Sequence, residues 1–109
     1  MPKSFRILTS VEYRRILRSG QRRSDPLFTV YAAANTFGHP RLGVTVARKV
    51  SNRSVVRNLI KRQIRESYRM ARNRMLPLDI VVIARPAAAT EPRQALRASL
   101  QQHWEKMHR

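Results

Sequence analysis

The stretch Arg57-Asn58-Leu59-Ile60-Lys61-Arg62-Gln63-Ile64-Arg65-Glu66 combines cationic side chains with apolar residues that recur at helical spacing. At about 100° per residue, a helix that continues to residue 72 has two distinct sides. One side, about 140° wide, holds Arg57, Asn58, Lys61, Arg62, Arg65, Arg69 and Arg72. The opposite side holds Val56, Leu59, Ile60, Ile64, Met70 and Ala71. The stretch therefore predicts a helix with a cationic face and a packing face.

The cationic face has too few acids to be an ordinary solvated surface. From Arg48 to Arg72 the sequence holds nine cations and a single acid, Glu66. Solvated helix faces usually mix both signs, because opposite charges at i,i+4 support the helix and like charges repel. A polyanion or counterions must cover such a face, and the pattern favours a nucleic-acid-binding helix over a merely solvated one.

The whole composition agrees with a polyanionic partner. The chain of 109 residues is predicted to form one RNA-binding domain, residues 1–109, and its 42% apolar content is enough for a folded core. Its formal net charge is +17, with 23 Lys and Arg against 6 Asp and Glu. Phosphate backbones are the commonest partner of such a protein. No apolar run approaches the roughly 18 to 20 residues that span a bilayer, so no membrane partner is expected.

The residue types present limit the location and the chemistry. The absence of cysteine excludes disulfides, thiolate zinc sites and a cysteine nucleophile. The first residues lack the apolar region of a secretory signal, so a cytoplasmic location is expected. The six acids are scattered singly, and His103 is interpreted as a helix-terminal or surface histidine. We therefore expect neither catalytic residues nor a metal site within this chain.

The first half of the chain reads as a helix followed by two strands. Thr9 and Glu12 have the spacing of a capping box, and the helix should end near Arg18, before Gly20. Residues 27–32 and 42–46 are predicted to be strands, joined as a hairpin through a turn at residues 38–40. The prediction leaves room for one further short strand before residue 27.

The second half adds the basic helix, a strand and a last helix. The basic helix should run from near residue 54 to near residue 74, and the apolar run 79–84 suits a strand buried on both faces. Thr90 is predicted to cap the last helix, which places Leu96, Leu100 and Trp104 on its inner side. The order α-β-β-α-β-α predicts an α+β sandwich, with helices packed on a small mixed sheet.

Several residues outside the cationic face are candidates for RNA contacts. Asn58 can donate and accept at a base or ribose edge, and Arg48, Lys49 and Arg53 lead into the helix N-terminus, which favours anions. Tyr13 and Tyr31 could stack on unpaired bases. The alternative for each tyrosine, a core position with its hydroxyl at the surface, stays open at this point.

The pattern Arg57-Asn58-x-x-Lys61-Arg62-x-x-Arg65-Glu66 resembles the signature of the bacterial ribonuclease P protein component. The similarity covers nearly the whole chain in the right order. It includes Gly38-His39-Pro40-Arg41, the strand and double cation from Leu42 to Lys49, the early Glu12-Tyr13, and the apolar run from Ile80 to Ala84. Ser51-Asn52-Arg53 differs from the glycine-containing entry of some members.

The resemblance implies a function and a set of site residues. The family removes the 5′ leader from precursor tRNA; its catalyst is a large RNA that binds the reactive Mg²⁺ ions, and the protein assists. Together with the cationic pattern, the resemblance predicts that Arg48, Lys49, Arg53, Arg57, Asn58, Lys61, Arg62, Arg65 and Arg69 face the catalytic RNA. It also predicts a leader-binding cleft lined by Tyr13, Leu17 and Tyr31, where Leu17 stands in a position that is aromatic in many members.

The resemblance also bears on the fold and the partners. It implies a left-handed strand–helix–strand crossover in a domain like those of ribosomal proteins, and no obligate protein partner. The main alternative is therefore a ribosomal or ribosome-assembly protein. A DNA-binding protein is a weaker alternative, because it does not explain the Asn58-centred motif. A nuclease that acts without RNA is also weaker, because the acids are scattered singly.

Overall fold

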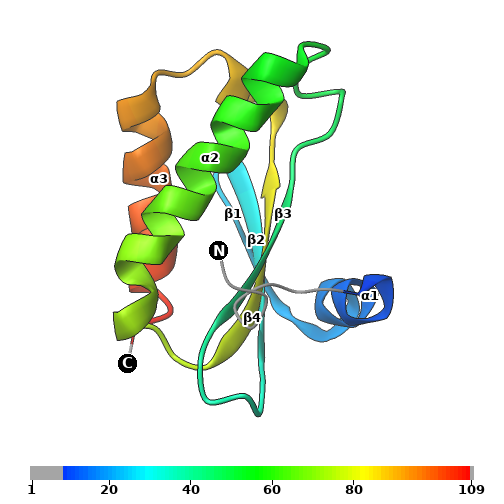
Figure 1. Cartoon of the computed structure of the whole chain (residues 1–109), viewed down its shortest axis with the longest axis vertical. Coiled ribbons are helices and arrows are strands. Elements are labelled where there is room, and N and C mark those ends of the chain that lie inside the picture. The colour runs from blue at the N-terminus through cyan, green and yellow to red at the C-terminus, as the bar shows by residue number, and fades with distance from the viewer. Residues whose placement is uncertain (1–8, 109) are drawn as a thin grey trace.

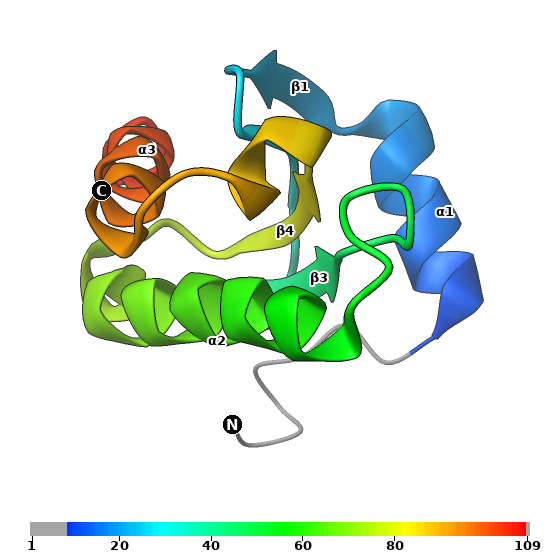
Figure 2. The same cartoon turned by 90° about the horizontal axis from the view of Figure 1, so that it is seen from above.

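The computed structural model describes residues 9–108, which form a four-stranded sheet with helices on both faces (Figure 1, Figure 2). The elements are α1 (Ser10–Ser19), β1 (Gln21–Ser24), β2 (Phe28–Ala34), β3 (Arg41–Thr45), α2 (Ser54–Ala71), β4 (Leu78–Ala84) and α3 (Arg93–Glu105), with 3₁₀ turns η2 (Arg72–Arg74) and η3 (Pro86–Ala89). Helices α2 and α3 cover one face of the sheet, and α1 lies on the other. The predicted α+β sandwich and the further short strand, β1, are confirmed. None of the described helices is long and apolar enough to cross a membrane.

The predicted hairpin between β2 and β3 is wrong, because β4 lies between them. The strand order is β1-β2-β4-β3, with β2 antiparallel and β3 parallel to β4. The hairpin is instead formed by β1 and β2, in which Gln21 pairs with Ala32. In β4, Ile80, Val81 and Val82 are all fully buried, so this strand takes a central place where both faces are covered.

The connection from β3 through α2 to β4 is left-handed, as the resemblance implied. The two strands are parallel neighbours, and α2 joins them across one face of the sheet. Seen from the α2 side with both strands running upward, β4 lies to the left of β3 (Figure 1, Figure 2). Such crossovers are right-handed in roughly 98% of cases. The hand therefore could not be inferred from hydrophobic patterning.

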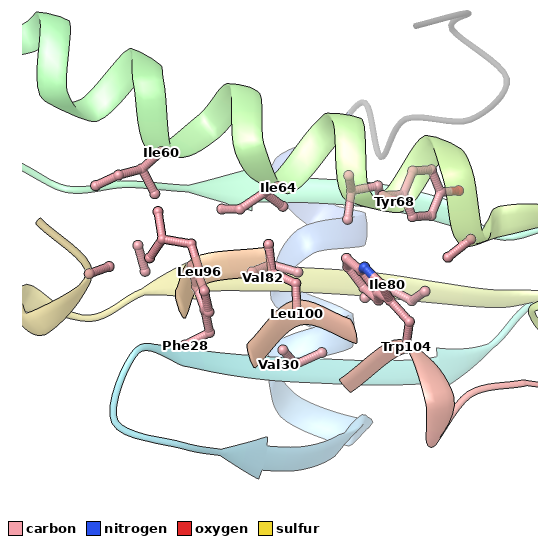
Figure 3. Close-up of a cluster of buried hydrophobic side chains, with 14 of the residues drawn as sticks. Phe28, Val30, Ile60, Ile64, Tyr68, Ile80, Val82, Leu96, Leu100 and Trp104 are labelled. Carbon is pink, nitrogen blue, oxygen red and sulfur yellow. The ribbon is translucent and has the colours of Figure 1, made fainter. Parts of the chain in front are cut away.

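The main core lies between the sheet and the pair α2 and α3 (Figure 3). Leu96, Leu100 and Trp104 face inward from α3, as predicted. The Trp104 ring meets Tyr68 of α2 edge-on at 5.9 Å, and its indole Nε1 donates to Ser67 Oγ over 2.8 Å. Burial and a satisfied indole N–H thus hold the two helices together.

The buried side of α2 is rotated from the predicted one. Leu59 and Met70, predicted to pack, are 47% and 77% exposed, whereas Gln63 and Ser67 are buried. The reason is that α2 packs against α3 as well as the sheet. Arg97 of α3 donates from Nε to Gln63 Oε1 at 2.6 Å. The rest of the predicted packing side is confirmed: Ile60, Ile64 and Ala71 are buried and Val56 packs against the core.

Of the two predicted helix caps, one is confirmed and the other is wrong. The capping box of α1 is confirmed, since Thr9 Oγ1 accepts from the Glu12 N–H at 3.1 Å while Glu12 Oε1 accepts from the Thr9 N–H at 3.2 Å. The Thr90 cap is wrong: Pro92 is the N-cap of α3, and the Thr90 hydroxyl donates to the Ala87 carbonyl. Residues 86–89 form their own 3₁₀ turn, and Thr90 closes that turn instead.

Candidate nucleic-acid interface

The predicted RNA-facing residues lie along the outer side of α2 and in the segment before it. We call this set the basic surface: Arg48, Lys49, Arg53, Arg57, Asn58, Lys61, Arg62, Arg65 and Arg69. Arg48 and Lys49 are exposed in the turn after β3, and Arg53 is the N-cap of α2. The other six lie on α2, where Arg57 and Lys61 are half-buried and the rest are exposed.

Two residues of the basic surface also have partners within the protein. Arg57 donates from Nη1 to the Ser51 carbonyl at 2.9 Å, which holds the turn against the helix. Arg62 pairs with Glu66 at 3.0 Å, and Glu66 also pairs with Arg97 at 2.9 Å. The hydrogen bond from Arg62 lowers the pKa of Glu66, so this carboxylate stays charged. Arg65 and Arg69 form no ion pair within residues 9–108 and remain open to an anion.

The N-terminus of α2 adds to the attraction for anions. Arg53 makes no side-chain capping bond, and the first turn contains no acidic residue. Free backbone N–H groups and the positive end of the helix dipole therefore lie beside Arg53 and the Arg48–Lys49 turn. This end of the basic surface is suited to a phosphate group.

The predicted cleft residues lie on the sheet face that carries α1. Arg15 of α1 reaches Asp79, so this face includes every second residue of β4: Asp79, Val81 and Ile83. Tyr31 pairs with Val81, and Thr45 pairs with Ile83, so both side chains share that face. The Tyr13 hydroxyl is hydrogen-bonded to Thr45 Oγ1. Tyr13 and Tyr31 therefore lie on one face, with Leu17 one helical turn beyond Tyr13.

Each of these three side chains is half-buried, which leaves part of its surface open. Burial raises the pKa of the Tyr13 hydroxyl, so it stays neutral at physiological pH. Half-buried aromatic rings can stack on an unpaired base.

A buried ionic cluster, absent from the sequence interpretation, fixes α1 to the sheet. We call it the Arg41 cluster: Arg41, Asp79, Glu12, Arg15 and Asn35. Arg41 binds Asp79 through two bonds of 2.8 Å, Nε to Oδ1 and Nη2 to Oδ2, and its Nη2 also donates to Glu12 Oε2 at 2.8 Å. The Arg41 and Asp79 side chains are only 7% and 0% exposed.

The remaining members complete the Arg41 cluster. Arg15 binds Asp79 at 3.2 Å, and Asn35 Nδ2 donates to Asp79 Oδ1 at 2.9 Å. Burial alone would raise the pKa of Asp79, but the bonds from Arg41 and Asn35 lower it, so the carboxylate is charged. The sequence contained one sign of this cluster, which is Asp79 near the start of an otherwise apolar strand. A carboxylate buried there requires a cationic partner.

A second polar cluster joins the β1–β2 turn to α3. Asp25 Oδ2 accepts from the Ser99 hydroxyl and lies 3.0 Å from His103 Nε2, while Oδ1 accepts from the Leu27 and Phe28 N–H groups. His103 lies in the last turn of α3, so the helix-terminal alternative is confirmed, but the surface alternative is wrong, because the side chain is buried beneath the β1–β2 turn. Serine and histidine both bind the carboxylate here, which is not the serine–histidine contact of a nucleophilic triad.

Comparisons of sequence and of structure with known proteins point to the same family. The ribonuclease P family model matches residues 1–108. The ribonuclease P protein component of Methylococcus capsulatus is 39% identical over 94% of this chain and 80% of its own length, and that of Klebsiella pneumoniae is 36% identical over 96% and 88%. The solved structure of the Staphylococcus aureus RNase P protein superposes with a TM-score of 0.88, at 35% identity over 95% of this chain and 94% of that one.

Proposed function

Because the chain belongs to the ribonuclease P protein family, we propose that the basic surface binds the catalytic RNA while the α1 face holds the precursor tRNA leader. The chain is a ribonuclease P protein component. In the proposed holoenzyme the RNA performs the cleavage, and the protein supplies electrostatic screening and substrate positioning. We expect the complex to act in the cytoplasm, without a membrane or an obligate protein partner.

The separation of the two surfaces is the observation that supports this division. Open cations and a free helix N-terminus occur on α2, whereas half-buried tyrosines occur on the α1 face. The two helices lie on opposite faces of the sheet (Figure 2). Charge without base contacts suits a folded RNA backbone, and aromatic rings suit an unpaired strand. A single domain can therefore contact both RNAs at once.

We propose that the acidic residues of this chain do not hold the Mg²⁺ ions of the reaction. Within residues 9–108 no group of three or more His, Asp or Glu side chains is placed to hold a metal ion. The carboxylates of Asp79, Asp25 and Glu66 are each bound by side chains of the protein. We propose that the RNA partner holds the magnesium ions, and that the +17 charge of the protein favours this by screening nearby phosphates.

The test is cleavage of precursor tRNA at low magnesium by a bacterial ribonuclease P RNA, with and without this protein. We expect the protein to stimulate cleavage at the correct 5′ site. A matched pair of variants, Arg65→Ala in the basic surface and Arg93→Ala at an exposed position of α3, separates specific from general charge effects. No stimulation with a compatible RNA would contradict the proposal and favour a ribosomal or ribosome-assembly role, which co-sedimentation with ribosomes in high salt would detect.

A further inference from the structure

Helix α1 has very little apolar attachment to the rest of the molecule. Ile16 is its one buried residue, whereas α3 buries Leu96, Leu100, His103 and Trp104. Tyr13 and Leu17 are only half-buried, so apolar packing of this ten-residue helix on the sheet is sparse. The orientation of α1 therefore depends in part on polar contacts.

The Arg41 cluster provides those contacts. The Arg41 guanidinium binds Asp79 of β4 and Glu12 of α1 simultaneously, each at 2.8 Å. Arg15, nearly one turn further along α1, binds the same Asp79 carboxylate. Phe37 lies against Arg41, with its ring centre 4.1 Å from the guanidinium carbon. Arg15 is thus tied to Asp79 directly and Glu12 is tied to it through Arg41, near the start of the central strand β4.

The cluster lies directly beside the candidate leader-binding residues. Glu12 precedes Tyr13 in the chain, and the Tyr13 hydroxyl is hydrogen-bonded to Thr45. A change in the angle of α1 would move Tyr13 and Leu17 relative to Tyr31, which belongs to the sheet. We infer that the Arg41 cluster is a positioning device that sets the geometry between α1 and the sheet and thereby controls leader binding. This inference rests on the proposed leader-binding function of the α1 face.

A positioning role differs from a merely structural one in what it predicts. Replacing a buried ion pair by apolar residues is often neutral for stability. A planar guanidinium, however, also fixes the relative orientation of the groups that it binds. If the cluster has only a structural role, variants should lose stability, but the folded fraction should bind each RNA as tightly as the wild type does. A positioning role predicts that a folded variant loses affinity for the leader alone.

Glu12→Gln is the variant that separates these outcomes. It removes the charged contact to Arg41 but leaves the buried Arg41–Asp79 pair intact. Glutamine is also accepted at the third position of a capping box. Thr9→Ala is the matched control, because it removes the cap hydroxyl at the same helix end and leaves the Glu12–Arg41 contact in place. A thermal melt of each protein confirms that it is folded.

The measurement is the affinity of the reconstituted holoenzyme for precursor tRNA and for mature tRNA. We expect Glu12→Gln to weaken precursor binding by about three- to tenfold and to leave mature tRNA binding unchanged, because α1 would leave the binding orientation part of the time and only the oriented fraction binds the leader. Thr9→Ala should behave as the wild type. Equal losses for both ligands, no loss for either, or the same loss in Thr9→Ala would overturn the inference. A wild-type holoenzyme that does not prefer precursor tRNA would instead contradict the leader-binding function.

Discussion

The two faces of the sheet are built in different ways. The face under α2 and α3 is an apolar core in which Ile64, Leu100 and Trp104 have no exposed surface. The face under α1 carries a buried ionic cluster, the buried apolar side chains of Ile16 and Val81, and half-buried tyrosines. Dense apolar packing resists displacement by water, whereas a polar and partly open face can exchange its contacts for those of a ligand. We infer that one face provides the stability and the other the binding of substrate.

The largest expected effect is on the apolar face. Trp104→Ala should lower the free energy of unfolding by about 3–5 kcal/mol, because it leaves a cavity and an unpaired Ser67 hydroxyl. Urea denaturation followed by circular dichroism measures this loss. The exposed neighbour Glu105→Ala is the control and should change stability by less than about 0.5 kcal/mol. A small loss at Trp104 would mean that the two faces contribute to stability in a similar way.

On the α1 face, Tyr31→Ala should act on binding rather than on folding. The loss of one stacking ring should weaken precursor tRNA binding by about 1–3 kcal/mol and leave mature tRNA binding unchanged. Binding titrations with the two RNAs measure the difference. Tyr31→Phe, which keeps the ring, serves as the control and should retain most of the affinity. If Tyr31→Ala weakened the binding of both RNAs equally, the cleft would not be the leader site.

The basic surface should respond through the salt dependence of RNA binding. Arg65→Ala should make the log–log salt slope of catalytic RNA binding shallower by about 0.7 to 0.9, since one phosphate contact is lost. Arg57→Ala should have the same effect and also lower stability, because Arg57 holds the Ser51 carbonyl. Titrations at several salt concentrations measure the effect on RNA binding, and thermal melts measure the effect on stability. An unchanged slope for Arg65→Ala would place that residue outside the RNA contact.

The smallest expected effect is a loss of fold stability at low pH. The bond from Arg41 lowers the pKa of Glu12, and bonds from Arg41 and Asn35 lower that of Asp79 despite its burial. Both carboxylates therefore stabilise the fold above their ordinary pKa values of about 4, and this stabilisation is lost as the pH falls below that range. Thermal melts from pH 3 to 7 should show the loss, with a smaller pH dependence in Glu12→Gln. Identical profiles for both proteins would contradict the role of Glu12.

The sequence predicted the parts of the fold that depend on local pattern. The capping box at Thr9, the start of α2 at Ser54 and the apolar strand β4 are confirmed, because periodicity and turn chemistry act over short separations. The α-helix ends at Ala71, before the predicted residue 74, and a 3₁₀ turn covers the last three residues. The hairpin between β2 and β3 was wrong, because strand pairing depends on which strand best tolerates burial on both faces. The Thr90 cap was wrong for a related reason, since a 3₁₀ turn competed for the same hydroxyl.

The charge, the basic face of α2 and the family signature are properties of residue type and spacing, so they can be read without any knowledge of the fold. Only the tertiary structure brought Arg41, Asp79 and Glu12 together, from three separate segments of the chain. It alone placed Tyr13 and Tyr31 on one face and exposed Leu59 and Met70. The physical reason is that a helical wheel or a strand alternation defines the sides of one element. Which neighbour covers each side is decided by the packing of all elements together.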